Sequence, residues 1–223
     1  ECGKPDFSVS DVPSSNTVKI AIGKQAKLMV GSDMAGFFAA KVKAAGGDPG
    51  KVQLVRFGAM AKVGGVRVAT VPAVHTNGVA ADFLEKNLAD TLRANGLTAH
   101  VGPPTGYVLT FSNGLVVYLS GDTGITAEQD LVVRRYYRAN LAVINIGDVF
   151  TTGPTEAAHV INEMVKPAEV ILSHANEVAT KGGQVVPGSR TDTFIKAAKV
   201  PAHVPLSGKP MTFDGRGKCV SGC

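Results

Sequence analysis

The feature that most constrains this chain is an apolar run that stops at a single carboxylate, Val116–Gly124. Its first four residues, Val-Val-Tyr-Leu, have no polar break, which predicts a short buried strand. Asp122 then stands between Gly121 and Thr123 on the following turn. Loops at strand ends carry much of the chemistry of α/β proteins, because the strand holds the loop still while substrate reaches it. Asp122 is therefore either a site residue or a residue that caps its own turn through its side-chain oxygen.

Two more expected strands end in a histidine. Thr70–Val74 leads to His75, and Val170–Ser173 leads to His174, with small or polar residues after each. Either histidine alone is more often structural than a ligand. Two imidazoles and a carboxylate at one edge of a sheet, however, suit Zn²⁺ or a similar divalent ion. His75, Asp122 and His174 together are therefore predicted to form a metal site.

The three remaining histidines have different surroundings. His159 lies inside a helical pattern, and His203 lies between Pro201 and Pro205. Both are predicted to be structural or surface residues. His100 precedes a Val-Gly-Pro-Pro segment and is left out of the predicted site.

Apolar spacing along the chain predicts a mixture of helices and strands. Helices are expected over 17–25, 33–45, 80–95, 126–140, 155–165 and 191–198, and strands over 26–30, 52–57, 66–71, 105–111, 115–119, 141–146, 170–173 and 211–213. Turn signals at 63–65 and 112–114 predict two hairpins. Hairpins together with alternating strands and helices indicate an α/β (α+β) fold with helices outside a mixed sheet or sheets. No linker is apparent, so a single domain over 1–223 is expected.

Charge and apolar pattern argue against two classes of partner. The formal net charge is +5, but the basic residues are scattered and form no stripe with interleaved aromatic residues of the kind that binds nucleic acid. No apolar run reaches the roughly 18 residues that cross a bilayer. We therefore expect a small-molecule substrate or ligand, no nucleic acid and no membrane. A homo-oligomer stays open as an alternative to a monomer.

All three cysteines lie near the chain ends, at Cys2, Cys219 and Cys223, the last two in a tail over 214–223. Unprotected thiols at exposed termini are a liability, so this placement favours a disulfide and a secreted or periplasmic protein. The alternative is three inert thiols in a cytosolic protein. A Cys219–Cys223 bond would close a small loop, whereas Cys2 bonded to either partner would join the two ends.

A series of short motifs follows in the order seen in one known family. They are Val71–Gly78, Gly106–Tyr107, Tyr118–Thr123, Asn145–Gly147, Phe150–Ala157 and Ile171–His174. Through them, residues 17–178 resemble the metallo-β-lactamase superfamily, most closely its lactonase-like, β-lactamase-fold hydrolase branch. The resemblance implies an αββα sandwich with a one- or two-metal site at one edge. It implies that His75 and His174 each ligate a metal and that Asp122 bridges two ions. Zn²⁺ is expected first, with Mn or Fe as alternatives.

The chain departs from the family at its signature, His-x-His-x-Asp-His, which should fall within residues 7–16. No histidine occurs there. Asp11 would keep the first position, as in exported members that begin the motif with Asp, while Pro13, Ser15 and Asn16 stand at the other three ligand positions. Proline cannot ligate through its side chain, and Ser and Asn are poor Zn²⁺ ligands. The strands that precede the motif in the family are also missing, so the expected domain is shortened at its N-terminal side.

Three explanations of this departure remain open. The chain is a piece of a longer precursor or needs a second chain, or it is a natural member whose metal site has decayed. The third explanation is a reduced site of His75, Asp122, His174 and Asp11, completed by water.

Two functions follow from these alternatives. As a hydrolase, the protein would use a divalent ion to activate water, and Asp122 would hold the metal and orient that water to attack a lactone, a β-lactam or another ester or amide. As a non-catalytic relative, it would keep the fold and bind a ligand or partner in the former cleft. The empty signature favours the second function. The three ligands kept at strand ends favour the first.

Overall fold

The computed structural model describes residues 16–79 and 84–223. Asp11 and Cys2 lie outside these residues. The chain divides into two compact units, one of residues 1–56 and 76–103, the other of residues 57–75 and 104–223. Whether they act as the single domain expected from the sequence stays a prediction. No helix of the described residues is long and apolar enough to cross a membrane.

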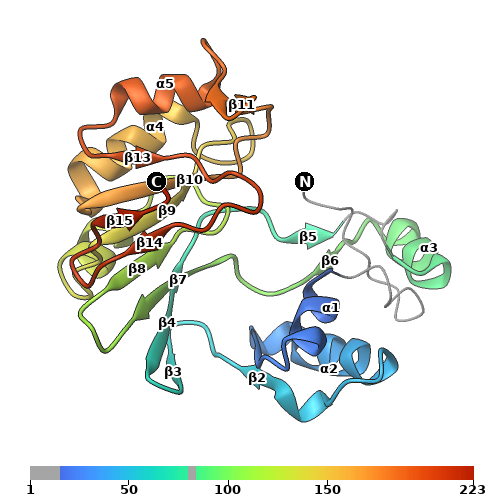
Figure 1. Ribbon diagram of the computed structural model, residues 1–223. Coiled ribbons are helices and arrows are strands. Elements are labelled where there is room, and N and C mark those ends of the chain that lie inside the picture. The colour runs from blue at the N-terminus through green and yellow to red at the C-terminus, as the bar shows by residue number, and fades with distance from the viewer. Residues whose placement is uncertain (1–15, 80–83) are drawn as a thin grey trace. The chain divides into compact units, whose positions relative to one another are not determined.

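In its described residues, the first unit contains short helices and two pairs of short strands (Figure 1). Its elements are α1 (Asn16–Gly23), β1 (Leu28–Val30), η2 (Ser32–Met34), α2 (Ala35–Ala44), η3 (Pro49–Lys51), β2 (Val52–Leu54), β5 (Gly78–Val79), α3 (Lys86–Ala94) and β6 (Ala99–His100). β1 pairs with β2 in parallel, and β5 pairs with β6 antiparallel. A small apolar core forms around Val18 and Val42, with Ile22, Phe38 and Val52 packed against it.

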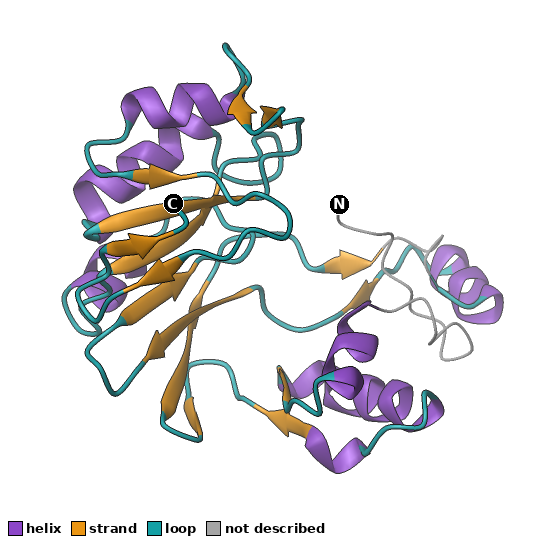
Figure 2. Cartoon of the chain, viewed as in Figure 1, coloured by secondary structure: helices purple, strands orange, loops and turns teal. Residues whose placement is uncertain are grey.

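The second unit is built on a seven-stranded mixed sheet with the strand order β13-β10-β9-β8-β7-β4-β3 (Figure 1), and Figure 2 shows its strands in orange. Its strands are β3 (Met60–Val63), β4 (Val66–Pro72), β7 (Thr105–Thr110), β8 (Val116–Leu119), β9 (Leu141–Asn145), β10 (Glu169–Ser173) and β13 (Ala202–His203). β3, β4, β7 and β8 are antiparallel neighbours. β8, β9, β10 and β13 run parallel. The carboxyl ends of β8, β9 and β10 therefore share one edge of the sheet.

Helices of the second unit bury one face of this sheet. They are the π-helical segment η5 (Gln129–Arg134), α4 (Pro154–His159), its π-helical continuation η6 (Val160–Val165) and α5 (Arg190–Ala197). Ile161 and Phe194 from these helices are fully buried in one core with Tyr118 and Ile144 of the sheet. Burial of such side chains is the main favourable term in folding, at roughly 1.5–3 kcal/mol each. The helices thereby hold the strands whose ends carry the predicted ligands.

Tyr118 in this core gives the protein an alkaline limit. Burial raises the pKa of the Tyr118 hydroxyl to about 12 from 10.0, and Gln129 Nε2 lies 3.5 Å from its oxygen. The unfolded chain ionises this tyrosine near pH 10, whereas the folded chain resists ionisation up to about 12. The contribution of Tyr118 to the free energy of unfolding is therefore fully present below pH 10. It is lost between pH 10 and 12, which lowers the free energy of unfolding by about 2–3 kcal/mol. We expect Tyr118→Phe to flatten this decline in urea unfolding measured across that range. Tyr136→Phe, at an exposed tyrosine, should leave it unchanged; equal slopes for both variants would contradict the assignment.

The structure confirms the expected fold class and most expected elements. The hairpin predicted at 112–114 is present as β7–β8. A hairpin also turns at 63–65, but it joins β3 to β4, whereas the strand expected over 52–57 pairs with β1 as β2. Two expectations were wrong in extent: the helix expected over 126–140 is only the segment Gln129–Arg134, and the strand Met60–Val63 was missed. In the part of the chain that the structure describes, the only large sheet is this one. The remaining strands form two-stranded pairs, including β11 (Thr180–Lys181) with β12 (Gln184–Val185).

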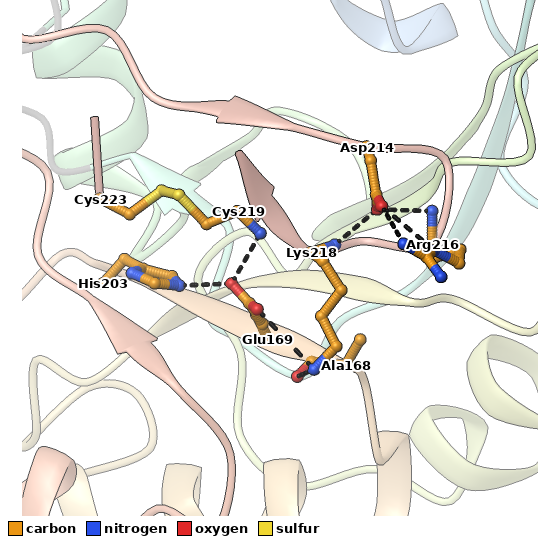
Figure 3. A network of polar contacts seen from close by, with 8 residues as sticks. All are labelled: Ala168, Glu169, His203, Asp214, Arg216, Lys218, Cys219 and Cys223. Carbon is orange, nitrogen blue, oxygen red and sulfur yellow. Dashed lines mark hydrogen bonds and ion pairs between the residues drawn. A yellow bond between two sulfur atoms is a disulfide. The ribbon is translucent and has the colours of Figure 1, made fainter. Parts of the chain in front are cut away.

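The C-terminal tail forms a hairpin against the opposite face of the sheet. It consists of β14 (Thr212–Phe213) and β15 (Cys219–Ser221), and a Cys219–Cys223 disulfide closes the small loop considered from the sequence. Figure 3 shows how the Glu169 carboxylate holds this tail: Oε2 accepts the Cys219 backbone N–H at 3.0 Å and lies 2.7 Å from His203 Nε2, while Oε1 lies 3.8 Å from Lys218 Nζ. The expectation that His203 is structural fits this buried pair.

Loss of the Glu169 carboxylate should loosen the tail. Glu169 is 7% exposed, so Glu169→Ala leaves His203 and the Cys219 N–H without their acceptor in a dry environment. We expect a loss of roughly 2–3 kcal/mol in the free energy of unfolding, measured in urea. Glu163→Ala removes an exposed carboxylate that pairs with Lys199 at 2.6 Å, and it should cost much less. Equal losses for the two variants would contradict this role for Glu169.

Candidate metal centre

The turn that carries Asp122 is fixed by close backbone packing. Gly121 adopts φ +62°, and a Cβ there would lie 2.9 Å from the Thr105 carbonyl oxygen. Only glycine accepts both this conformation and this approach without strain. The turn places the Asp122 side chain at the sheet edge, where it is 45% exposed. The carboxylate therefore remains accessible although Ser120 and Thr123 beside it in the chain are buried.

His174 reaches the same point from two strands away. Its Nε2 lies 3.1 Å from Asp122 Oδ2, and its side chain is 24% exposed. β9 separates the two parent strands, so the loop after β9 must pass beneath the His174 backbone. Gly147 permits this passage, because a Cβ there would lie 2.5 Å from the His174 carbonyl oxygen and 2.7 Å from Asn176 Nδ2.

The two loops at this edge carry unusual backbone strain. Asp148 and Val149 after β9 have φ of +61° and +63°, and His174 and Asn176 after β10 have φ of +46° and +54°. Left-handed conformations of non-glycine residues are uncommon, above all for β-branched valine, and each costs of order 1–3 kcal/mol. Strain of this kind collects at functional sites, where the surrounding structure enforces it. Its concentration beside Asp122 and His174 marks this edge as the candidate site.

His75 lies on a loop that is attached to the Asp122 turn. The preceding residue, Val74, donates its N–H to Thr123 Oγ1 at 3.0 Å and accepts the Gly124 N–H at 2.9 Å. His75 itself is half-buried. Within residues 16–79 and 84–223, however, no three His, Cys, Asp or Glu side chains gather into a group that could hold a metal ion. The structure thus pairs Asp122 with His174, and it ties the His75 loop to the Asp122 turn through the Thr123 hydroxyl and the Gly124 N–H.

The Asp122–His174 pair has the right donors for a transition metal. Bond lengths of about 2.0–2.2 Å place adjacent ligand atoms roughly 2.9–3.5 Å apart, which includes the observed 3.1 Å. Imidazole nitrogen and carboxylate oxygen are both ordinary Zn²⁺ ligands. Without metal, the same distance is that of an ion pair, which carries opposite charges only when the imidazole is protonated. The pair fits a divalent ion as two ligands of an incomplete set.

Sequence reasoning did not find the polar residues buried behind this edge. Asn145, Ser120, Thr123 and Thr152 are each at most 4% exposed. They hydrogen-bond to one another and to the loop backbones. A signal existed at Asn145, which ends the apolar run Leu-Ala-Val-Ile where a polar side chain must find buried partners.

Comparison with known proteins gives relatives by sequence. No family model matches the chain. It is 32% identical over 127 residues to a UPF0173 metal-dependent hydrolase of Roseiflexus castenholzii, and 38% identical over 109 residues to one of Chloroflexus aurantiacus. The matches cover 56% and 49% of this chain, but 46% and 40% of those proteins. The chain therefore covers less than half the length of either relative.

Solved structures give relatives by fold. Igni18, a metallo hydrolase from the archaeon Ignicoccus hospitalis, matches with a TM-score of 0.58 at 19% identity, over 87% of this chain and 72% of that one. An isothiocyanate hydrolase from Delia radicum gut bacteria matches with a TM-score of 0.51 at 13% identity, over 85% and 68%. At such identities the likeness concerns fold alone. The chain is similar in sequence to part of the UPF0173 metal-dependent hydrolases, and it shares the fold of the metallo hydrolase Igni18.

Proposed function

We propose that the protein is a metal-dependent hydrolase whose site lies at the carboxyl ends of β8 and β10. The single observation that carries the proposal is the 3.1 Å approach of His174 Nε2, on a strained loop, to the accessible Oδ2 of Asp122. The names of its sequence relatives support a divalent metal. We propose Zn²⁺, with Mn and Fe as alternatives, and a lactone, a β-lactam or another ester or amide as substrate.

The roles of the residues follow from their charges and positions. When bound, a divalent ion at this edge would lower the pKa of a water and polarise a carbonyl oxygen. Asp122 supplies negative charge on a short, rigid turn, so its oxygens stay where the strand places them. His174 offers Nε2 to the same point, provided that this nitrogen is deprotonated. His75 would join from the loop clamped to Thr123, and Asp11 stays in the proposed ligand set although it lies outside the described residues.

A second function is kept because of one specific observation. Residues 7–16 contain no histidine, although the family signature should fall there. A chain that lacks these ligands would use the same edge to bind a small molecule without hydrolysing it. Metal binding separates the two functions, since only the hydrolase requires it.

Metal content of the purified full chain tests the proposal. We expect about one divalent ion per chain by mass spectrometry, removable by a strong chelator, with metal and activity lost together. His174→Ala should weaken metal binding by roughly 10²-fold or more, because it removes one ligand of very few. His159→Ala, at an exposed helical histidine, is the matched control and should retain the metal. A chain that holds no metal and keeps the same stability in chelator would contradict the hydrolase proposal.

A further inference from the structure

Thr123 occupies a central position between the two loops that carry Asp122 and His75. Its side chain is completely buried, and its hydroxyl oxygen accepts the Val74 N–H at 3.0 Å. The same hydroxyl lies 2.9 Å from the Gly124 carbonyl oxygen, which it can donate to. The hydroxyl thus both accepts and donates a hydrogen bond. It links Thr123, which follows Asp122, to Val74, which precedes His75.

Asn145 holds Thr123 from the other side. Its Nδ2 donates to the Thr123 carbonyl oxygen at 3.1 Å and to Thr152 Oγ1 at 2.8 Å, so both amide hydrogens are used. Its backbone N–H donates to Ser120 Oγ at 3.2 Å. Asn145 is fully buried, so water cannot replace these partners.

Thr152 brings the loop after β9 into the same network. Its backbone N–H donates to the Thr123 carbonyl oxygen at 3.0 Å, and its hydroxyl lies 3.1 Å from the Asn145 carbonyl oxygen. The loops after β4, β8 and β9 therefore share one dry set of hydrogen bonds. A buried network of this kind has few alternative arrangements, because each unmade bond leaves a desolvated polar group.

We propose that Thr123 is a positioning residue, which fixes the His75 loop relative to Asp122 so that both side chains can serve one ion. This inference rests on the proposed metal site. Thr123 would touch neither metal nor substrate. Its hydroxyl sets where Val74 lies, and Val74 sets where His75 begins. Residues that orient metal ligands in this indirect way typically change metal affinity by 10–100-fold when they are replaced.

Three variants separate positioning from simple structural support. Thr123→Val keeps the shape and removes the hydroxyl, whereas Thr123→Ser keeps the hydroxyl and removes a methyl group. Thr152→Val also removes a hydroxyl from the network, but it leaves the Thr123–Val74 hydrogen bond in place. If Thr123→Val does not fold, Thr123→Cys replaces it, because a thiol is a weak acceptor.

The first measurement is zinc affinity of the full chain by competition with a chelating dye. We expect a loss of roughly 10–100-fold for Thr123→Val and a change within about threefold for Thr123→Ser and Thr152→Val. The second is hydrogen exchange of the Val74 amide in metal-free protein, which should accelerate at least tenfold in Thr123→Val alone. Unchanged zinc affinity and exchange in Thr123→Val would overturn the inference.

The outcomes also separate this inference from the proposed function. If the unsubstituted chain takes up no zinc, manganese or iron, the proposed function fails, and Val74 exchange then decides by itself whether Thr123 clamps the two loops. If the unsubstituted chain binds metal and all variants bind it equally well, the proposed function stands and the positioning role fails.

Discussion

We expect replacement of Asp122 by Asn to lower kcat/KM for hydrolysis by roughly 10²–10³-fold and to lower metal affinity with it. The physical reason is that Asn keeps the size and one acceptor oxygen of Asp but removes the negative charge that holds a divalent ion. Replacing a residue that only orients a metal ligand typically lowers metal affinity or activity by 10–100-fold, so replacing a ligand itself should lower them further. The Asp122 side chain is 45% exposed, so the substitution should change the free energy of unfolding very little.

Kinetics with an ester or lactone substrate and metal analysis of the same sample would measure this loss. Asp130→Asn is the matched control, since it removes an equal charge from a carboxylate that pairs with Arg134 and Arg135. The control should keep both metal and activity. An Asp122→Asn protein with full metal content and full kcat/KM would remove Asp122 from the site.

Gly147→Ala is expected to cost about 3 kcal/mol in the free energy of unfolding. Its new methyl group would lie 2.5 Å from the His174 carbonyl oxygen, a distance at which backbone must move. His174 already has φ +46°, so the β10 loop has little freedom to yield in place. We therefore expect His174 to move away from Asp122, and metal affinity to fall along with stability.

Urea unfolding and zinc competition on the same variant would measure both effects. Gly65→Ala is the control, because a Cβ at Gly65 meets no atom within 4 Å and its φ is not in the left-handed region. It should be neutral within about 0.5 kcal/mol. A Gly147→Ala protein as stable as the control would show that the two loops pack less tightly than the structure has them.

The sequence predicted those parts of the fold that depend on neighbours along the chain. Apolar runs on both sides of the turn 112–114 identify both strands of the β7–β8 hairpin. The short strand Met60–Val63 was missed because apolar Met60 takes an exposed position, so its sequence does not alternate between polar and apolar as its exposure does. A π-helical segment replaced the longer helix expected over 126–140, and its wider turn is not visible in apolar spacing.

The candidate site could be predicted to the level of strand ends, but not to that of contacts. Asp122 and His174 were found because each follows an apolar run, and parallel strands bring such ends together. The buried group around Asn145 was not found, because Ser120, Thr123 and Thr152 look like ordinary loop residues until the sheet register is known. Side chains whose partners come from distant loops leave no periodic trace in a sequence.

The mixed direction of the seven-stranded sheet also has a consequence for folding. In the antiparallel half, the pairs β3–β4 and β7–β8 close through short turns at 63–65 and 112–114, although residues 73–104 separate β4 from β7; β8, β9, β10 and β13 join only through long crossovers. Contacts between residues close in sequence form first, since they cost less chain entropy to close. The edge that carries Asp122 and His174 should therefore be completed late, when the parallel strands dock. Nascent chains of this protein would expose the apolar β9 and β10 until that step, which makes the half that bears Asp122 and His174 also the half most open to aggregation during synthesis.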